Sequence, residues 1–271
     1  MSEQPASQKE KTLTVEEAIA DLKGDDSGAQ YYAAWWLGRF RVRDQNAIQA
    51  LIDALEDEKD RSPDGGYPLR RNAARALGKL GDPQAVAGLI KSLGCSDYYV
   101  REAAAQSLGM IGDDEAIAPL MKLIEGGIEA ANPIPGCPHL AEPFDSIIEA
   151  LGMLNAKEAL RLIEPFQEHA IALVQYSCAR AMYQLTGDPT YGDRLVEALE
   201  GDKLQLRRSA LSDLGAIGYL PAAPAIAETL AENSLKLISL KGVLETELNQ
   251  NGQTGLSDAA IEVMKLMDSL L

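Results

Sequence analysis

The sequence lacks the motifs by which most enzymes are found. Among its 271 residues there is no glycine-rich phosphate loop, no Gly-x-Ser-x-Gly elbow and no Cys-x-x-Cys pair. His139 and His169 are the only histidines, which excludes a histidine-rich metal site, and we predict no metal centre. No set of residues forms a complete catalytic constellation. A function must therefore be sought in binding and positioning.

Positive charge is also scarce. The chain has 25 Lys and Arg residues against 41 Asp and Glu residues, a formal net charge of −16. Such a surface repels phosphate backbones, so we predict no nucleic-acid partner. Two interpretations of the acidity stay open at this point: solubility alone, or attraction to a basic face of a partner protein.

Cysteines are few and apolar runs are short. Cys95, Cys137 and Cys178 are odd in number and widely spread, which favours a reducing cytosol over a disulfide framework. Cys137-Pro138-His139 is the only Cys/His pair, and it is either an ordinary loop segment or a metal-ligand or nucleophile site. No apolar run approaches the roughly 20 residues of a membrane span. We therefore expect a cytoplasmic protein without membrane insertion.

Aromatic residues make up only 5% of the chain, and strand-like alternation is absent. What is present instead is a repeat. The block Leu69–Asp82 returns as Val100–Asp113, about 31 residues later, which is the length of two short helices and two turns. Further copies lie at Tyr31–Phe40, Asp145–Leu154, Val174–Asp188 and Leu206–Gly218. The repetition predicts an all-α fold, an alpha-alpha superhelix of the HEAT-like or armadillo type.

Each copy contains the signals of two helices joined by a turn. Ala73, Ala74 and Leu77 cover one helix face and predict its burial. Gly78, Gly109 and Gly215 follow that face and allow a neighbouring helix to approach closely. Gly81-Asp82-Pro83 ends one helix and starts the next. Arg70, Arg101 and Arg207 share one repeat position, which favours a structural role.

These signals predict a single solenoid over residues 1–271. Residues 1–12 lack the apolar centre of a signal peptide and are expected to be a disordered leader. Thr14 and Glu17 form a potential capping box that starts a capping helix at 14–23. Repeats then fill 29–248, with loop insertions at 57–66 and 126–144 that project from an edge. After a polar linker at Asn249–Asp258, an amphipathic helix at 259–271 either caps the stack or docks onto a partner.

The first copy of the repeat is altered. When Leu37-Gly38 is aligned with Leu77-Gly78, Trp35 stands opposite Arg75 and Trp36 opposite Ala76. Tyr31 and Tyr32 likewise replace polar residues, so four large aromatic side chains gather in one copy. Two interpretations remain open: packing against the capping helix, or an exposed stacking surface for a flat ligand or a partner.

Three arginines follow these aromatic residues. Arg39, Arg41 and Arg43 stand where other copies have a turn glycine and an aspartate. The spacing of Tyr32, Trp36, Arg39 and Arg43 predicts that one helix face presents all four. A planar, conjugated ligand that carries carboxylates suits such a surface, because its rings stack on the aromatic side chains and its carboxylates pair with guanidinium groups.

The segment YYAAWWLGRFRV at 31–42, followed by blocks that end in Leu-Gly-x-Ile/Leu-Gly-Asp, resembles the E subunit of the E/F-type phycobilin lyases over essentially the whole chain. The resemblance implies an alpha-solenoid that forms a heterodimer with a smaller F-type lyase subunit. Together the two attach phycocyanobilin to one cysteine of the alpha-phycocyanin apoprotein through a thioether, and the family is also associated with chromophore removal or transfer. The bilin is then a substrate, and no cofactor of the chain's own is expected.

The residues fit that implied chemistry. Phycocyanobilin is a conjugated tetrapyrrole with two propionates, and the client thiol adds across its ethylidene group, so the lyase needs no nucleophile. Candidate chromophore-binding residues are Tyr32, Trp35, Trp36, Arg39 and Arg41. Candidate proton donors are Asp97 and Tyr98, although both also fit a plain repeat turn. Rival hypotheses are a non-catalytic HEAT scaffold, a bilin-binding protein of phycobilisome assembly or breakdown, and a lyase for another phycobiliprotein.

Overall fold

The structure, a computed structural model, describes residues 13–251 and 256–271, and none of these residues lies in a strand. The predicted leader at 1–12 lies outside the described residues. The all-α prediction is confirmed. The helices up to the second insertion are α1 (Val15–Lys23), α2 (Ser27–Arg39), α3 (Gln45–Ala54), α4 (Pro68–Leu80), α5 (Val86–Ser92), α6 (Tyr98–Ile111), α7 (Ile117–Ile124) and α8 (Gly127–Ala130). Those that follow are α9 (Phe144–Met153), α10 (Leu160–Ile163), α11 (Ala172–Thr186), α12 (Pro189–Glu197), α13 (Leu204–Ile217), α14 (Ala223–Glu228), α15 (Asn233–Asn251) and α16 (Asp258–Asp268).

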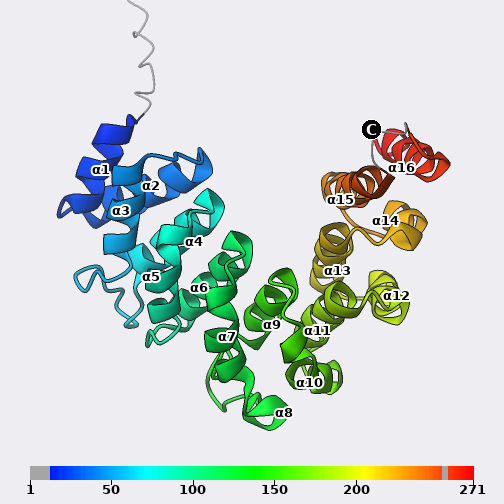
Figure 1. Cartoon of the computed structure of the whole chain (residues 1–271), viewed down its shortest axis with the longest axis horizontal. Coiled ribbons are helices and arrows are strands. Elements are labelled where there is room, and N and C mark those ends of the chain that lie inside the picture. Colours follow the sequence, from blue (N-terminus) through cyan, green and yellow to red (C-terminus); the bar gives the residue numbers. More distant parts are fainter. Residues whose placement is uncertain (1–12, 252–255) are drawn as a thin grey trace, which may run out of the picture. The chain divides into compact units, whose positions relative to one another are not determined.

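The chain forms two compact units, the first ending at Ser107 and the second beginning at Leu108. In each unit the first helices of the repeats pack side by side, and we call this arrangement the first-helix layer (Figure 1). It contains α2, α4 and residues 98–107 of α6 in the first unit, and residues 108–111 of α6 together with α9, α11, α13 and α15 in the second. The second helices cover one side of each layer. The predicted single stack over 29–248 stays a prediction, because each unit is described by itself.

Local sequence signals explain where the helices begin and end. The capping box of Thr14 and Glu17 is present at the start of α1. Asp82 accepts a hydrogen bond from the backbone N–H of Gln84, and a 3-10 turn at Pro83–Ala85 leads into α5. Gly81 ends α4 in the left-handed conformation, with φ 68°, a region that costs glycine nothing. The predicted turn at Gly81-Asp82-Pro83 is therefore confirmed.

Glycines bring the helices of the first-helix layer together. A Cβ atom on Gly109 would lie 2.9 Å from the Cα of Ala150, and one on Gly215 would lie 2.8 Å from the Cα of Ser239. Only glycine fits at such distances, so the predicted close approach is confirmed at both positions. Across the layer of the first unit, the hydroxyl of Ser107 donates to the carbonyl oxygen of Ala74 at 2.8 Å.

The arginines at the shared repeat position bind the loops that precede their helices. Arg70 Nε donates to the carbonyl oxygen of Asp57, and Arg101 Nη1 donates to that of Cys95 at 2.7 Å. Arg207 Nη1 donates in the same way to Gly201. Each guanidinium group thus anchors a loop to the start of a first helix, which confirms the structural role predicted for this position.

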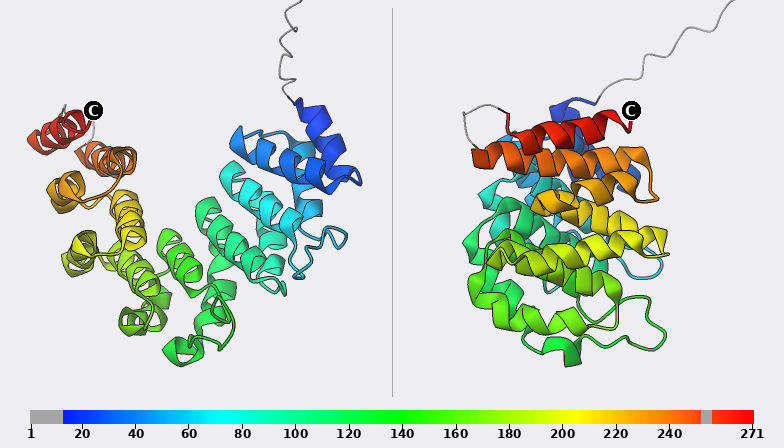
Figure 2. Two further views of the ribbon diagram at one scale, coloured as in Figure 1. Left: turned by 180° about the vertical axis from the view of Figure 1, so that it is seen from behind. Right: turned by 90° about the vertical axis from the view of Figure 1, so that its right-hand side faces the viewer.

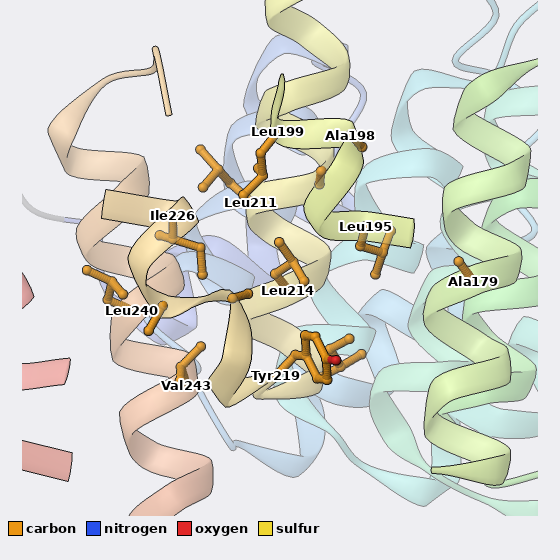
Figure 3. Close-up of a cluster of buried hydrophobic side chains, with 14 of the residues drawn as sticks. Ala179, Leu195, Ala198, Leu199, Leu211, Leu214, Tyr219, Ile226, Leu240 and Val243 are labelled. Carbon is orange, nitrogen blue, oxygen red and sulfur yellow. The ribbon is translucent and has the colours of Figure 1, made fainter. Parts of the chain in front are cut away.

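The core of the second unit lies between its first and second helices. Leu195, Leu199, Leu211, Leu214 and Ile226 meet there, and Leu240 and Val243 of α15 close the cluster (Figure 3). The helix α16 adds Val263 to this core and lies against α15 (Figure 2). Burial of these aliphatic side chains, at about 25 cal/mol per Å² of apolar area, is the main force that holds the repeats together.

The two insertions are attached to the repeats. In the segment 57–66, the Asp60 carboxylate accepts from the N–H of Leu69 at 2.9 Å, which ties the loop to α4. The segment 126–144 contains α8, and the imidazole Nε2 of His169 lies 2.8 Å from the carbonyl oxygen of Ala131. Near the C-terminus, α15 continues to Asn251, so the predicted linker is helical at Asn249, and residues 252–255 lie outside the description.

Candidate functional site

Helix α2 positions most of the candidate site. Asp26 caps it by accepting hydrogen bonds from the N–H groups of Gly28 and Ala29 at 2.9 and 3.0 Å. Ala33, Ala34 and Leu37 are completely buried, as the repeat pattern predicts. Because these three residues hold one face of the helix against the core, the aromatic side chains between them are directed elsewhere.

Those aromatic side chains lie at the surface of the chain. Tyr32 is 51% exposed, Trp35 is 43% exposed, and Trp36 is half-buried. The rings of Tyr32 and Trp35 stack with centroids 5.6 Å apart, and the ring of Trp36 lies 5.2 Å from that of Phe40. Packing against the capping helix α1 therefore leaves a large part of the Tyr32 and Trp35 rings uncovered.

The other repeats show what this face of α2 lacks. In α4, the equivalents of Tyr32, Trp36 and Phe40 are Asn72, Ala76 and Leu80, and all three are buried. They face α2: Asn72 donates to the carbonyl oxygen of Tyr31, and Ala76 lies against Gly38. No first helix precedes α2 in the described part of the chain, so its aromatic row, Tyr32, Trp36 and Phe40, has no first helix packed on it as α4 has. Phe40 is accordingly 61% exposed.

The arginines cluster around the end of α2, although not as the spacing predicts. The helix ends at Arg39, so Arg43 lies beyond it, and the prediction that one helix face carries Arg43 is wrong. The physical reason is Arg41, which adopts a left-handed conformation with φ 50° at the position where Gly81 ends α4. The N–H of Val42 then donates to the carbonyl oxygen of Leu37 at 3.1 Å and closes the turn.

Arg39, Arg41 and Arg43 are all exposed. With the residues of 13–251 and 256–271 they form no ion pair. Their guanidinium groups are free to bind carboxylates beside the stacked rings. The α2 surface, which we define as Tyr32, Trp35, Trp36, Phe40, Arg39 and Arg41, thus combines ring faces with cations. Chemically it suits a flat, conjugated anion.

The predicted proton donors lie elsewhere in the first unit, at the start of α6. Asp97 Oδ2 accepts from the N–H of Tyr67 at 2.7 Å, and Oδ1 accepts from the N–H of Tyr99 at 2.8 Å. Asp97 therefore caps α6 and holds the start of α4. Tyr98 is half-buried, with its ring 5.9 Å from the guanidinium carbon of Arg101. The hydrogen bonds of Asp97 give it a structural task, and its catalytic role stays a prediction.

Two further features of the described residues bear on reactivity and metal binding. Cys137 Sγ lies 3.4 Å from His139 Nδ1 in the second insertion. Burial raises the pKa of the Cys178 thiol to about 12, so it is unreactive. Residues 13–251 and 256–271 contain no group of three metal-binding side chains. In the same ranges no helix is both long and apolar enough to cross a bilayer.

Sequence reasoning missed two features. Phe40 belongs to the α2 surface, and its signal was the replacement of the aliphatic residue Leu80 by an aromatic ring at the same repeat position. The second feature is a buried cluster of Glu149, Arg180 and Asp213 in the second unit. The cluster cannot be predicted from any single repeat, because each of three copies contributes one residue.

Comparison with known proteins places the chain in a family. A model of HEAT repeats matches residues 60–127, and a model of the PBS lyase HEAT-like repeat matches residues 29–57. The chain is 63% identical over 269 residues to the phycocyanobilin lyase subunit alpha of Microchaete diplosiphon, an alignment that covers 97% of this chain and 92% of that protein. It is 45% identical over 243 residues to the bilin biosynthesis protein PecE of a Nostoc strain, covering 89% of this chain and 90% of that protein.

A solved structure agrees with these matches. The complex of CpcE and CpcF of phycocyanin lyase from Nostoc sp. PCC7120 contains a chain that is 56% identical, with a TM-score of 0.90 and 100% of both chains covered. The resemblance that the YYAAWWLGRFRV segment carries is thereby confirmed. The chain belongs to the family of phycocyanobilin lyase alpha subunits, the E subunits of the E/F-type lyases.

Proposed function

We propose that this chain is one subunit of a heterodimeric bilin lyase that attaches phycocyanobilin to a cysteine of the alpha-phycocyanin apoprotein. Its partner is an F-type subunit, without which it is inactive. The relatives named phycocyanobilin lyase subunit alpha and the likeness to the CpcE and CpcF complex support this function. We place the reaction in the cyanobacterial cytosol, close to the phycobilisomes.

The reaction requires the lyase to position the pigment, and it requires no nucleophile from the lyase because the client thiol supplies it. The sulfur of the client cysteine adds to the ethylidene group of ring A, a C–S bond forms, and the thiol proton ends on the pigment. No electrons are gained or lost overall. Holding the pigment in one conformation with its reactive carbon against the thiol lowers the barrier by several kcal/mol. A positioned acid or phenol, for which Asp97 and Tyr98 are the candidates, assists the proton transfer.

The exposed α2 surface is the observation that carries the assignment of the site. Its stacked Tyr32 and Trp35 rings suit the conjugated pyrroles, and its arginines suit the two propionates. We therefore assign pigment contact to Tyr32, Trp35, Trp36, Arg39 and Arg41. The pigment is a substrate in this scheme, and the chain carries no cofactor of its own.

Reconstitution tests the function. The purified chain, an F-type partner, phycocyanobilin and the alpha-phycocyanin apoprotein are mixed, and pigment that stays attached after denaturation is measured. We expect covalent, far-red-absorbing product only when both subunits are present. Product formed without this chain would contradict the proposal. Binding of the apoprotein that needs no pigment and yields no product would instead support a scaffold.

Substitution tests the site. We expect Trp36→Ala combined with Arg39→Ala to weaken pigment binding about 10- to 100-fold, which corresponds to about 1.4–2.7 kcal/mol. Helicity stays intact because both side chains lie at the surface. Lys79→Ala is the matched control, since Lys79 occupies the repeat position of Arg39 and is exposed on α4. Unchanged pigment affinity together with lost partner association would move these residues from the pigment site to the subunit interface.

A further inference from the structure

A buried ion-pair cluster joins three successive helices of the first-helix layer in the second unit. Arg180 on α11 places Nη1 3.3 Å from Glu149 Oε2 on α9 and 3.2 Å from Asp213 Oδ1 on α13. The side chain of Asp213 is only 4% exposed, and that of Arg180 is 12% exposed. One guanidinium group therefore serves two carboxylates. When both are ionised, the cluster carries an uncompensated negative charge inside the protein.

Repeat stacking does not require this charge. The residues at the position of Asp213 in the other first helices α4, α6, α9, α11 and α15 are Ala76, Ser107, Ala150, Ala181 and Ser239. The serines bond locally across the layer: Ser239 Oγ donates to the carbonyl oxygen of Leu211, as Ser107 does to Ala74. A small side chain is sufficient there. A carboxylate is costly in comparison, because its desolvation exceeds what half of one guanidinium group returns.

Among the described residues, none near the cluster supplies a second cation. Ser177 Oγ donates to Glu149 Oε1 at 2.7 Å, and Ser209 Oγ lies 3.5 Å from Asp213 Oδ2. The cationic groups of α12, α13 and α15 near the cluster are engaged elsewhere, as is Asp193 of α12. On α12, Arg194 donates to Gln167 and Gln175, and Asp193 accepts from Tyr219. On α15, Lys236 donates to the carbonyl oxygen of Ala227, and Lys241 pairs with Glu245. On α13 itself, Arg208 pairs with Glu232.

We propose that Glu149, Arg180 and Asp213 form a proton-operated switch in the second unit. With a proton on Asp213, the cluster is neutral and Arg180 pairs with Glu149 alone. Without it, two carboxylates compete for one guanidinium group, and the contact of α11 with α13 loosens. The proposal stands on this unit alone and does not depend on the function of the α2 surface.

The direction of the effect follows from proton binding. Burial, and after it the neighbouring charge of Glu149, raise the pKa of Asp213 to about 7, against the lowering effect of the Arg180 guanidinium group. In the unfolded chain the same carboxyl titrates near 3.8. The folded state thus holds the proton over a window in which the unfolded state has lost it. Stability from this group is present at acid pH and is lost as the pH rises to about 7.

Thermal unfolding of the full chain between pH 5 and pH 8.5 tests the switch. We expect the Tm of the wild type to fall relative to that of Asp213→Asn by at least about 3 °C across this range. Asp213→Ser, which copies Ser107 and Ser239, gives the same result and guards against a packing defect of the amide. Glu149→Gln moves the midpoint of the fall to lower pH, because it removes the repelling charge.

Glu245→Gln is the matched control. It removes an exposed carboxylate of the same unit that pairs with Lys241, and it leaves the pH dependence unchanged. The proposal is overturned if the wild type, Asp213→Asn and Asp213→Ser show parallel Tm curves over the whole range. It is also overturned if Glu149→Gln moves the midpoint to higher pH, since that outcome would make Glu149 a stabiliser of the ionised Asp213.

Discussion

At one repeat position α2 of the first unit carries Trp36, whereas α9, α11 and α13 of the second unit carry Ala150, Ala181 and Asp213. The alanines are buried against the preceding first helix, the tryptophan is half-buried on a helix that no first helix precedes in the described part of the chain, and the aspartate is buried in an ion cluster. Because a methyl group is enough for packing at this position, both the indole and the carboxylate need another explanation. The comparison thus separates residues that are needed for helix packing, the alanines, from residues that packing does not require, Trp36 and Asp213.

Close contact between helices is what the two units share. A Cβ atom on Gly38 would lie 2.8 Å from the Cα of Ala76 in the first unit, and one on Gly152 would lie 2.8 Å from the Cα of Ala181 in the second. The backbones meet at equal distances although the side chains around them differ. The two units therefore share the same close packing of first-helix backbones, which we call the frame. They differ in which side chains they expose or bury around that packing.

The largest effect is expected where this frame is broken. Gly38→Leu and Gly152→Leu each drive a side chain into the neighbouring backbone, and we expect each to lower the free energy of unfolding by about 1–3 kcal/mol. Urea unfolding followed by circular dichroism measures the loss. Gly94→Ala is the control, because its Cβ meets only the carbonyl oxygen of Lys91 at an ordinary 3.5 Å. If either leucine variant matched the wild type, the units would not share a close-packed frame.

A smaller effect tests whether pigment binding is confined to the first unit. Trp35 and Glu149 occupy the same repeat position, one in each unit. We expect Trp35→Ala to weaken phycocyanobilin binding about 10-fold, or about 1.4 kcal/mol, because the stack with Tyr32 is lost. Glu149→Gln leaves pigment affinity unchanged. A spectral titration with the F-type partner present measures both. Equal losses in the two variants would extend the pigment site into the second unit and remove the proposed division.

The repeat frame was predictable from the sequence because its signals are local. Gly81-Asp82-Pro83 specifies its own turn, and Ala73, Ala74 and Leu77 specify a buried face within one helix. The exposure of Phe40 could not be predicted in this way, since Leu80 at the same position is buried by a neighbouring first helix that α2 lacks. The ion cluster was equally hidden, because stacking joins one residue from each of three distant copies.

The end of α2 shows where a local rule failed and why. Spacing along a helix placed Arg43 on the same face as Tyr32, but the left-handed turn at Arg41 ends the helix first. Arginine is a weaker sequence signal for a left-handed turn than glycine, because its side chain disfavours positive φ. The sequence signal was present only as the alignment of Arg41 with Gly81.

The smallest effect concerns this same turn. Arg41 has φ 50° where Gly81, Gly112, Gly187 and Gly218 end their helices, so its Cβ adds strain that they avoid. We expect Arg41→Gly to raise the free energy of unfolding by about 0.5–1 kcal/mol and, because a guanidinium group is lost, to weaken pigment binding. Asn155→Gly is the matched control: Asn155 has φ 52°, but asparagine tolerates this region, so its gain is smaller. Urea unfolding and pigment titration of both variants separate strain from binding. Lower stability of Arg41→Gly would mean that contacts of the arginine side chain outweigh its strained backbone, and that the first unit keeps Arg41 for its fold rather than for its ligand.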